Sequence, residues 1–199
     1  MPSISKVLIC NMSLSNIGAK STIESITELS TEAKACNLWY DFSLKQALEA
    51  FNWSFARKRF TLAAHGDDAP EDIWAYRYQY PSDCVAAREI VNPAGKDADA
   101  VPFEVQISDD GTKSILTNLD DAELIYTFLQ ENTTMFSAHF VEMFSYILAA
   151  HISFSITGKR TIKGDMLAMA RSLLRVAPAQ NAREATEEPI REAEWIRGR

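Results

Sequence analysis

Apolar side chains recur at three- and four-residue steps along the first fifty residues of the chain. The first run stops at Gly18, a residue type that commonly ends helices, and predicts a helix over about residues 4–17. The second run begins at Ser30 or Thr31, both good N-caps, and predicts a helix over about residues 31–52. The stripe expected to face the core consists of Cys36, Tyr40, Leu44, Ala47, Leu48 and Phe51.

Alternation of apolar and polar positions replaces the helical step in the middle of the chain, over about residues 53–129. Aromatic side chains occupy every second position of 74–80, and Pro81 closes that segment. Residues 103–107 alternate in the same way, and the sequence Asp-Asp-Gly at 109–111 supplies a hairpin turn. The pattern predicts a small antiparallel sheet with polar loops.

Helical spacing returns in the last third and predicts helices over about residues 134–157 and 161–177. Pro178 is expected to kink or end the last of them, because proline lacks a backbone N–H. The predicted fold class is α+β: a helical bundle of about four helices, with a small antiparallel sheet inserted between helices 2 and 3. Residues 1–179 would form one domain, and 180–199 an extended C-terminal tail.

The segment 134–157 is long and apolar enough to suggest a membrane span. Polar residues interrupt it, among them His139, Glu142 and His151, so a buried helix is expected and no membrane association. The N-terminus lacks the uninterrupted apolar stretch of a signal peptide, which indicates synthesis in the cytoplasm. Three separated cysteines without a CxxC pair favour reduced core thiols.

Charge and motifs limit the chemistry that the chain is expected to perform. The formal charge of −7 argues against a surface that binds nucleic-acid phosphates. The one compact basic run, Arg57-Lys58-Arg59, fits pairing with acidic loops of a neighbouring subunit, or solvation, better than DNA contact. No glycine-rich phosphate loop, zinc-protease motif or nucleophile elbow occurs, so we expect no catalytic residue, metal or cofactor, and no enzyme.

Two other functions stay open at this point. His139, Glu142 and His151 lie on one predicted helix, and with a further ligand they could serve a small metal-dependent hydrolase. The chain could also be a cytoplasmic binding module. For the histidines, hydrogen bonding inside a packed helix is the more ordinary interpretation.

Several ordered segments carry a family resemblance. The first segment, residues 28–40, contains Glu28, Ser30, Glu32-Ala33, Cys36 and Tyr40. The second segment contains Leu48-Glu49 followed by Trp53-Ser54-Phe55-Ala56. Residues 74–84 read Trp-x-Tyr-x-Tyr-x-Tyr-Pro-x-Asp-Cys, with Arg88 after them. Pro102-Phe103-Glu104-Val105, Ile115-Leu116-Thr117 and the stop at Thr157-Gly158 follow in order. Together they resemble the head-to-tail adaptors of short-tailed bacteriophages, the tail tubular protein A and head-completion family.

The resemblance implies a structural adaptor in the virion, at the head-tail junction, made in the host cytoplasm. Relatives of this kind form a homo-oligomeric, dodecameric ring between the portal protein and the tail nozzle protein, and DNA passes through the channel without sequence-specific binding. The implied portal-binding residues are Pro189, Ile190, Trp195, Ile196, Arg197 and Arg199. The aromatic residues expected to pack between subunits are Trp53, Phe55, Tyr78, Tyr80, Phe140 and Phe144.

Overall fold

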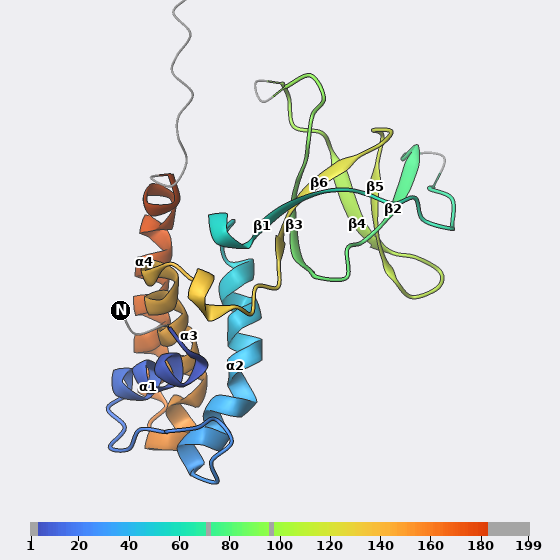
Figure 1. The fold of residues 1–199 in the computed structure, drawn as a ribbon. Helices are drawn as coiled ribbons and strands as arrows, with labels where there is room; N and C mark the ends of the chain where they lie inside the picture. Colours follow the sequence, from blue (N-terminus) through green and yellow to red (C-terminus); the bar gives the residue numbers. More distant parts are fainter. Residues whose placement is uncertain (1–3, 71–72, 96–97, 183–199) are drawn as a thin grey trace, which may run out of the picture.

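The computed structural model describes residues 4–70, 73–95 and 98–182, with side chains up to residue 179. The described chain divides visibly into a helical bundle and a β module, which lies beside the upper end of the bundle in Figure 1. The helices are α1 (Lys6–Asn16), α2 (Thr31–Glu49), α3 (Ala138–Thr157) and α4 (Thr161–Ala182). Short 3-10 helices at Ser54–Ala56 and Thr133–Met135 lead out of the bundle and back into it.

Local capping explains where three of the helices begin. The hydroxyls of Ser5, Ser30 and Ser137 each accept a hydrogen bond from a backbone N–H in the first turn of α1, α2 and α3. Each bond satisfies a donor that would otherwise have no partner within the helix. At the other end of α3, Gly158 adopts a left-handed conformation with φ of 68°, which glycine allows without steric cost.

The helix α3 forms the centre of the bundle. It packs against α1, α2 and α4, and Phe140, Phe144 and Leu148 are fully buried on it. Among the described helices it alone is long and apolar enough to cross a membrane, and most of its surface is covered by its neighbours. Burial between three helices accounts for its all-round apolar sequence, as expected for a core helix.

The described part of α4, Thr161–Ala182, passes through Pro178, so the helix does not end at this residue, which was one of the two outcomes predicted for it. A proline inside a helix costs one backbone hydrogen bond and crowds the preceding turn. Ala177, immediately before it, is fully buried, and Leu173 and Leu174 pack on the bundle core. We infer that this packing holds the last turns in helical form.

In the described residues, six strands form the β module: β1 (Arg57–Thr61), β2 (Tyr76–Gln79), β3 (Cys84–Ile90), β4 (Phe103–Ile107), β5 (Lys113–Thr117) and β6 (Glu123–Phe128). They pair as two antiparallel sheets of three strands, in the orders β1-β6-β3 and β2-β5-β4. The tight turn before β5 makes β4 and β5 a hairpin, whereas β1 pairs with β6 across more than sixty intervening residues.

The predicted fold class is therefore wrong in its account of the sheet. The structure is a mixed α/β fold with four helices and two three-stranded sheets, and the strands precede α3 and α4 as a substantial body of their own. This module has its own hydrophobic core, which includes Tyr78, Ile90, Ile115, Leu124 and Tyr126. Alternation indicates that a segment is extended, but it does not say which strands pair, and pairing decides the number of sheets.

Two of the three cysteines lie together in the bundle core. Cys10 on α1 and Cys36 on α2 are fully buried free thiols, as predicted from their spacing. A hydrogen bond between the two thiols, together with burial, raises the pKa of Cys10 far above its ordinary value. Cys84, at the start of β3, is half-buried and also free. The first two are thus packing residues.

Candidate functional site

Arg88 joins the β module to the bundle. It lies on β3, and its Nη2 donates to the carbonyl oxygens of Leu48, Glu49 and Phe51, at 3.1, 3.0 and 2.9 Å. Its Nε donates to Thr127 Oγ1 on β6 at 2.9 Å. The guanidinium thus satisfies carbonyls at the C-terminal end of α2, where the helix offers acceptors and a partial negative charge.

Burial lowers the pKa of the Arg88 guanidinium from its ordinary value. An arginine titrates so far above neutrality that the group stays charged. The desolvation cost is offset by charge-assisted hydrogen bonds to the three carbonyls, which are stronger than neutral ones. Arg88 belongs to the segments that carry the family resemblance, although its role at this joint could not be read from the sequence.

The basic run at the start of β1 is largely neutralised within the chain. Lys58 Nζ lies 2.5 Å from Asp83 Oδ2 and 4.1 Å from the centre of the Phe128 ring. Arg59 pairs with Glu123 on the adjacent strand β6. Two of the three positive charges thus have acidic partners within the same chain, whereas the sequence had suggested acidic loops of a neighbouring subunit or solvation.

Asp83 receives two hydrogen bonds at the edge of a surface pocket that Lys58, Phe60 and Tyr80 also line. Besides Lys58, the Tyr126 hydroxyl donates to its Oδ1 at 2.9 Å. Partial burial alone would raise the pKa of the carboxyl, but the bonds from Lys58 and Tyr126 stabilise the charged form and bring the pKa below its ordinary value.

Asp83→Asn is expected to reduce the acid sensitivity of the fold. Because the folded-state pKa of Asp83 is lowered, the carboxylate stabilises the protein above a pH of about 4, and this contribution is lost as the pH falls through the folded-state pKa. The melting temperature of the variant should lie below that of the wild type near neutral pH, and the gap should narrow in acid. Circular dichroism melts across a pH series measure this.

A matched variant, Tyr126→Phe, removes one donor to the same carboxylate. It should show part of the same effect, and high salt should shrink the contribution of the exposed Lys58 pair. A gap between Asp83→Asn and wild type that stays constant from neutral pH to acid would contradict this assignment.

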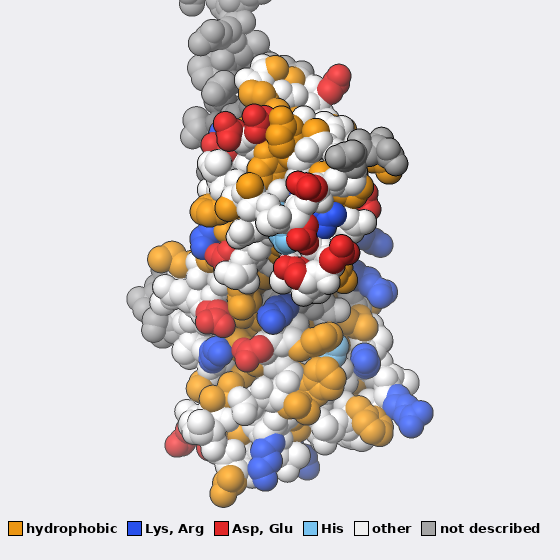
Figure 2. Space-filling view, turned by 90° about the vertical axis from the view of Figure 1, so that its right-hand side faces the viewer, with side chains coloured by type: hydrophobic (Ala, Val, Ile, Leu, Met, Phe, Trp, Pro, Cys, Tyr) orange, Lys and Arg blue, Asp and Glu red, His pale blue; other side chains and the backbone are white. Residues whose placement is uncertain are grey.

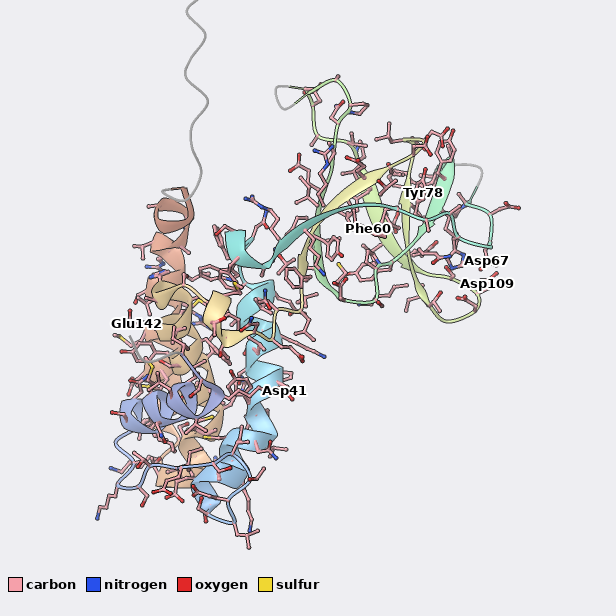
Figure 3. All side chains as sticks on the ribbon, in the orientation of Figure 1. Asp41, Phe60, Asp67, Tyr78, Asp109 and Glu142 are labelled. Carbon is pink, nitrogen blue, oxygen red and sulfur yellow. The ribbon has the colours of Figure 1, made fainter. Side chains whose placement is uncertain are left out.

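Two loops meet at the far end of the β module, where Asp67 and Asp109 are labelled in Figure 3. There the described residues bring potential metal ligands of His65, Asp67 and Asp110 within 4.8 Å of one another. His65 Nδ1 accepts a hydrogen bond from the Asp67 backbone N–H at 3.0 Å, so in the neutral ring the proton is on Nε2. Nε2 in turn lies 3.3 Å from Thr112 Oγ1.

Both ring nitrogens of His65 thus have partners, and each lies 3.8 Å from the nearer carboxylate oxygen. A cation would have to displace these bonds and draw the loops closer. We interpret these residues as a structural contact that holds the loop after β1 against the β4–β5 turn. The sequence showed His65 beside Asp67, but only folding brings Asp110 to them.

The histidines proposed for a metal-dependent hydrolase are held apart. His139 and His151 are twelve residues apart on α3, which corresponds to about 18 Å along a helix. His139 Nε2 lies 2.9 Å from the Leu173 carbonyl, and His151 Nε2 lies 3.0 Å from Gln46 Oε1. Each ring therefore donates to an oxygen, and Glu142 between them is exposed (Figure 3). Burial lowers the pKa of His151, which favours its neutral form.

The aromatic residues expected to pack between subunits lie mostly in the interior of this chain. Trp53, Tyr78, Phe140 and Phe144 are buried, and Tyr80 is half-buried. Trp53 packs edge-on against Phe140 and donates its indole N–H to the Ala47 carbonyl at 3.0 Å. Phe55 also contacts Phe140. These rings build the cores of the bundle and the β module, so their apolar character is explained within one chain.

Other apolar side chains are exposed instead. Leu38 and Phe42 project from α2, Met169 and Val176 from α4, and Ile107 from the edge strand β4. Figure 2 shows hydrophobic side chains gathered over the lower part of the face that α2 occupies. On α2 the signal was present in the sequence, because Leu38 and Phe42 lie outside the stripe that was assigned to the core.

The portal-binding residues expected in the tail, from Pro189 to Arg199, lie outside the described residues. No protein-family model matches the chain, and no curated protein sequence matches it. The resemblance to phage adaptors therefore rests on the ordered sequence motifs alone.

Proposed function

We propose that this chain is a non-enzymatic subunit of a ring that joins the portal to the tail nozzle in a short-tailed phage virion. The observation that carries the proposal is the division of the described chain into two bodies with separate hydrophobic cores. A helical bundle can pack side by side with copies of itself, while a projecting β module can contact a different protein along the ring axis. The ordered sequence motifs support the same function.

The β module has edges suited to such a contact. The strand β4 lies at the edge of its sheet, and Val105 and Ile107 on it are exposed. Edge strands expose unpaired backbone groups, and proteins commonly use them to bind an extended segment of a partner. In the proposed ring this edge would be a contact for the nozzle protein.

Charge supports the role of a conduit. The net charge of −7 per chain makes strong binding of duplex phosphates unfavourable. Two cations of the basic run, Lys58 and Arg59, are already paired with acidic side chains. A channel through which DNA moves needs weak, sequence-independent contact. In the proposed ring, DNA would pass without being bound at a defined sequence.

The proposal is tested by mixing the full chain with purified portal rings encoded in the same genome. The full chain should bind the portal rings and form a ring visible by negative-stain electron microscopy. A chain that ends at Ala182 keeps all four helices but lacks residues 183–199, so its binding should be lost or greatly weakened.

Equal binding by the shortened chain would remove the portal role of the tail, including Trp195 and Ile196. A full chain that stays monomeric by light scattering and does not bind portal rings would overturn the adaptor function itself. A correctly folded shortened chain, verified by circular dichroism, is the necessary control.

A further inference from the structure

The helix α4 carries a row of exposed cations on the side of the bundle away from the β module (Figure 1). Lys163, Arg171 and Arg175 are separated by multiples of four residues, so their side chains follow one ridge of the helix. The remaining position of the row, Leu167, is half-buried. A further exposed arginine lies just before the helix begins. We call these four cations the basic ridge: Arg160, Lys163, Arg171 and Arg175.

The ridge begins on the flank of α4 that is nearer to α2. The guanidinium of Arg160 lies 5.5 Å from the centre of the Phe154 ring on α3. Burial lowers the pKa of His151 and the positive charge of Lys163 lowers it further, so these two side chains are close. His151 in turn bonds to Gln46 of α2. The first two cations thus lie over the part of α3 that meets α2.

The acidic residues of α3 and α4 do not neutralise the ridge. Within the described part of the chain, no salt bridge includes any of its four cations. Asp165, the one acidic residue of α4, is two positions from Lys163, and side chains two apart on a helix do not face each other. Glu142, the one acidic residue of α3, lies three positions before Ser145, which bonds to Asn16 of α1. It is therefore on the α1 side of α3.

The acidic residues of α2 are also placed elsewhere. Asp41 pairs with Lys6 of α1. Glu49 is the last residue of α2 and lies at the joint with the β module. Glu32 lines a pocket near the α3–α4 turn together with Lys159, a further cation, so these two charges balance each other. The ridge is therefore a locally basic surface on a chain whose net charge is −7.

The composition of this surface favours phosphate over a protein partner. The positions beside the ridge on its solvent side are Gly164, Ala168 and Ser172, all exposed and small. A protein interface usually has an apolar centre inside a polar rim, whereas the middle of this surface consists of arginines and small residues. A guanidinium group binds phosphate through two parallel hydrogen bonds, and small neighbours let a phosphate backbone approach the helix.

The length of the ridge fits contact along one strand of a duplex. From Lys163 to Arg175 the helix rises about 18 Å, which corresponds to about five base pairs of duplex DNA. Contacts from lysine and arginine to phosphates carry no sequence information and weaken steeply as salt rises. Such a ridge can meet DNA without binding a defined sequence.

We propose that the basic ridge contacts the phosphate backbone of duplex DNA, weakly and without sequence preference. The inference rests on the proposed ring function, because in such a ring α4 would turn this ridge toward the channel. The rest of the acidic subunit would repel the same phosphates. The duplex would thus be guided along the ridge and still be free to move.

Fluorescence anisotropy tests the contact. The full chain, alone and assembled on portal rings, is titrated against a labelled DNA duplex of random sequence over a series of salt concentrations. The wild type should bind at low salt and lose affinity as salt rises. Arg171→Ala combined with Arg175→Ala should lower the affinity at low salt by at least about tenfold, and should reduce the slope of log affinity against log salt by about one for each arginine.

The matched control combines Lys34→Ala with Lys45→Ala on α2. Both lysines are exposed and belong to no salt bridge among the described residues. Each double variant removes two positive charges and changes the net charge from −7 to −9. The control should therefore stay within about twofold of the wild-type affinity if the position of the charges matters. Circular dichroism verifies that both double variants are folded.

The outcomes separate this inference from the ring function. Equal losses in the two double variants would show a general effect of net charge and would overturn the ridge as the DNA contact. No DNA binding by the wild type at low salt, free or on portal rings, would overturn it as well and leave the adaptor function standing wherever rings form. An arginine variant that keeps its DNA affinity but no longer forms rings would assign the ridge to an acidic protein surface instead. A wild type that binds DNA as expected but never assembles on portal rings would remove the ring function and retain the DNA contact.

Discussion

Phe140→Ala is expected to lower the free energy of unfolding by about 3–5 kcal/mol, the usual cost of truncating a buried aromatic ring. Phe140 is fully buried on α3, and its ring contacts those of Trp53, Phe55, Phe136 and Phe144. Removing it leaves a cavity that these rings cannot fill without leaving their own positions. Urea denaturation followed by circular dichroism measures the change.

Phe154→Ala makes the same substitution on the same helix, at a side chain that is 53% exposed. It should cost much less, within about 1 kcal/mol, because little apolar surface returns to water. A loss below about 1 kcal/mol for Phe140→Ala would mean that the core of the bundle is not packed around this ring.

Arg88→Ala is expected to destabilise the protein by about 2–4 kcal/mol, because it leaves three carbonyls at the end of α2, two of them in partly buried bonds, without their charged donor. The effect should be local as well. Backbone amides in the last turn of α2 and in β3 should exchange with deuterium faster than in the wild type, since this side chain links the two segments.

Arg88→Lys retains the positive charge but not the planar fork of donors, so it should recover less than half of the loss. Arg57→Ala, a change at an exposed arginine on β1, should alter stability by no more than about 0.5 kcal/mol. Full recovery by lysine would indicate that charge alone, and not the geometry of the guanidinium, holds the joint.

The joint at Arg88 also bears on the proposed function. If the bundle forms the ring and the β module contacts the nozzle, the position of one body relative to the other sets the distance between the two contacts. The bonds from Arg88 to the end of α2 are one element of that positioning. Portal binding and nozzle binding could then be measured separately on Arg88→Ala, with nozzle binding expected to weaken more.

Local signals in the sequence were enough to place most of the secondary structure. Ser30 and Gly158 act within one helical turn, so the start of α2 and the end of α3 followed from neighbouring residues, whereas the predicted end of α2 at 52 and start of α3 at 134 were wrong by a few residues. The exception is Pro178, where packing of Ala177 overrides the local preference against a helix. Alternation likewise revealed extended segments in the middle of the chain, because side chains of a strand point to opposite faces in turn.

By itself, the sequence determined the four helices, the extended middle segment and the acidic charge, since these depend on residue type and on spacing over a few positions. Only the tertiary structure decided which strands pair, which aromatic rings are internal and which apolar residues stay exposed. Arg88 reaches α2 across about forty residues, and Asp110 reaches His65 across about as many. Such contacts depend on which distant segments come together in the fold, and the spacing of apolar residues along the chain does not specify this.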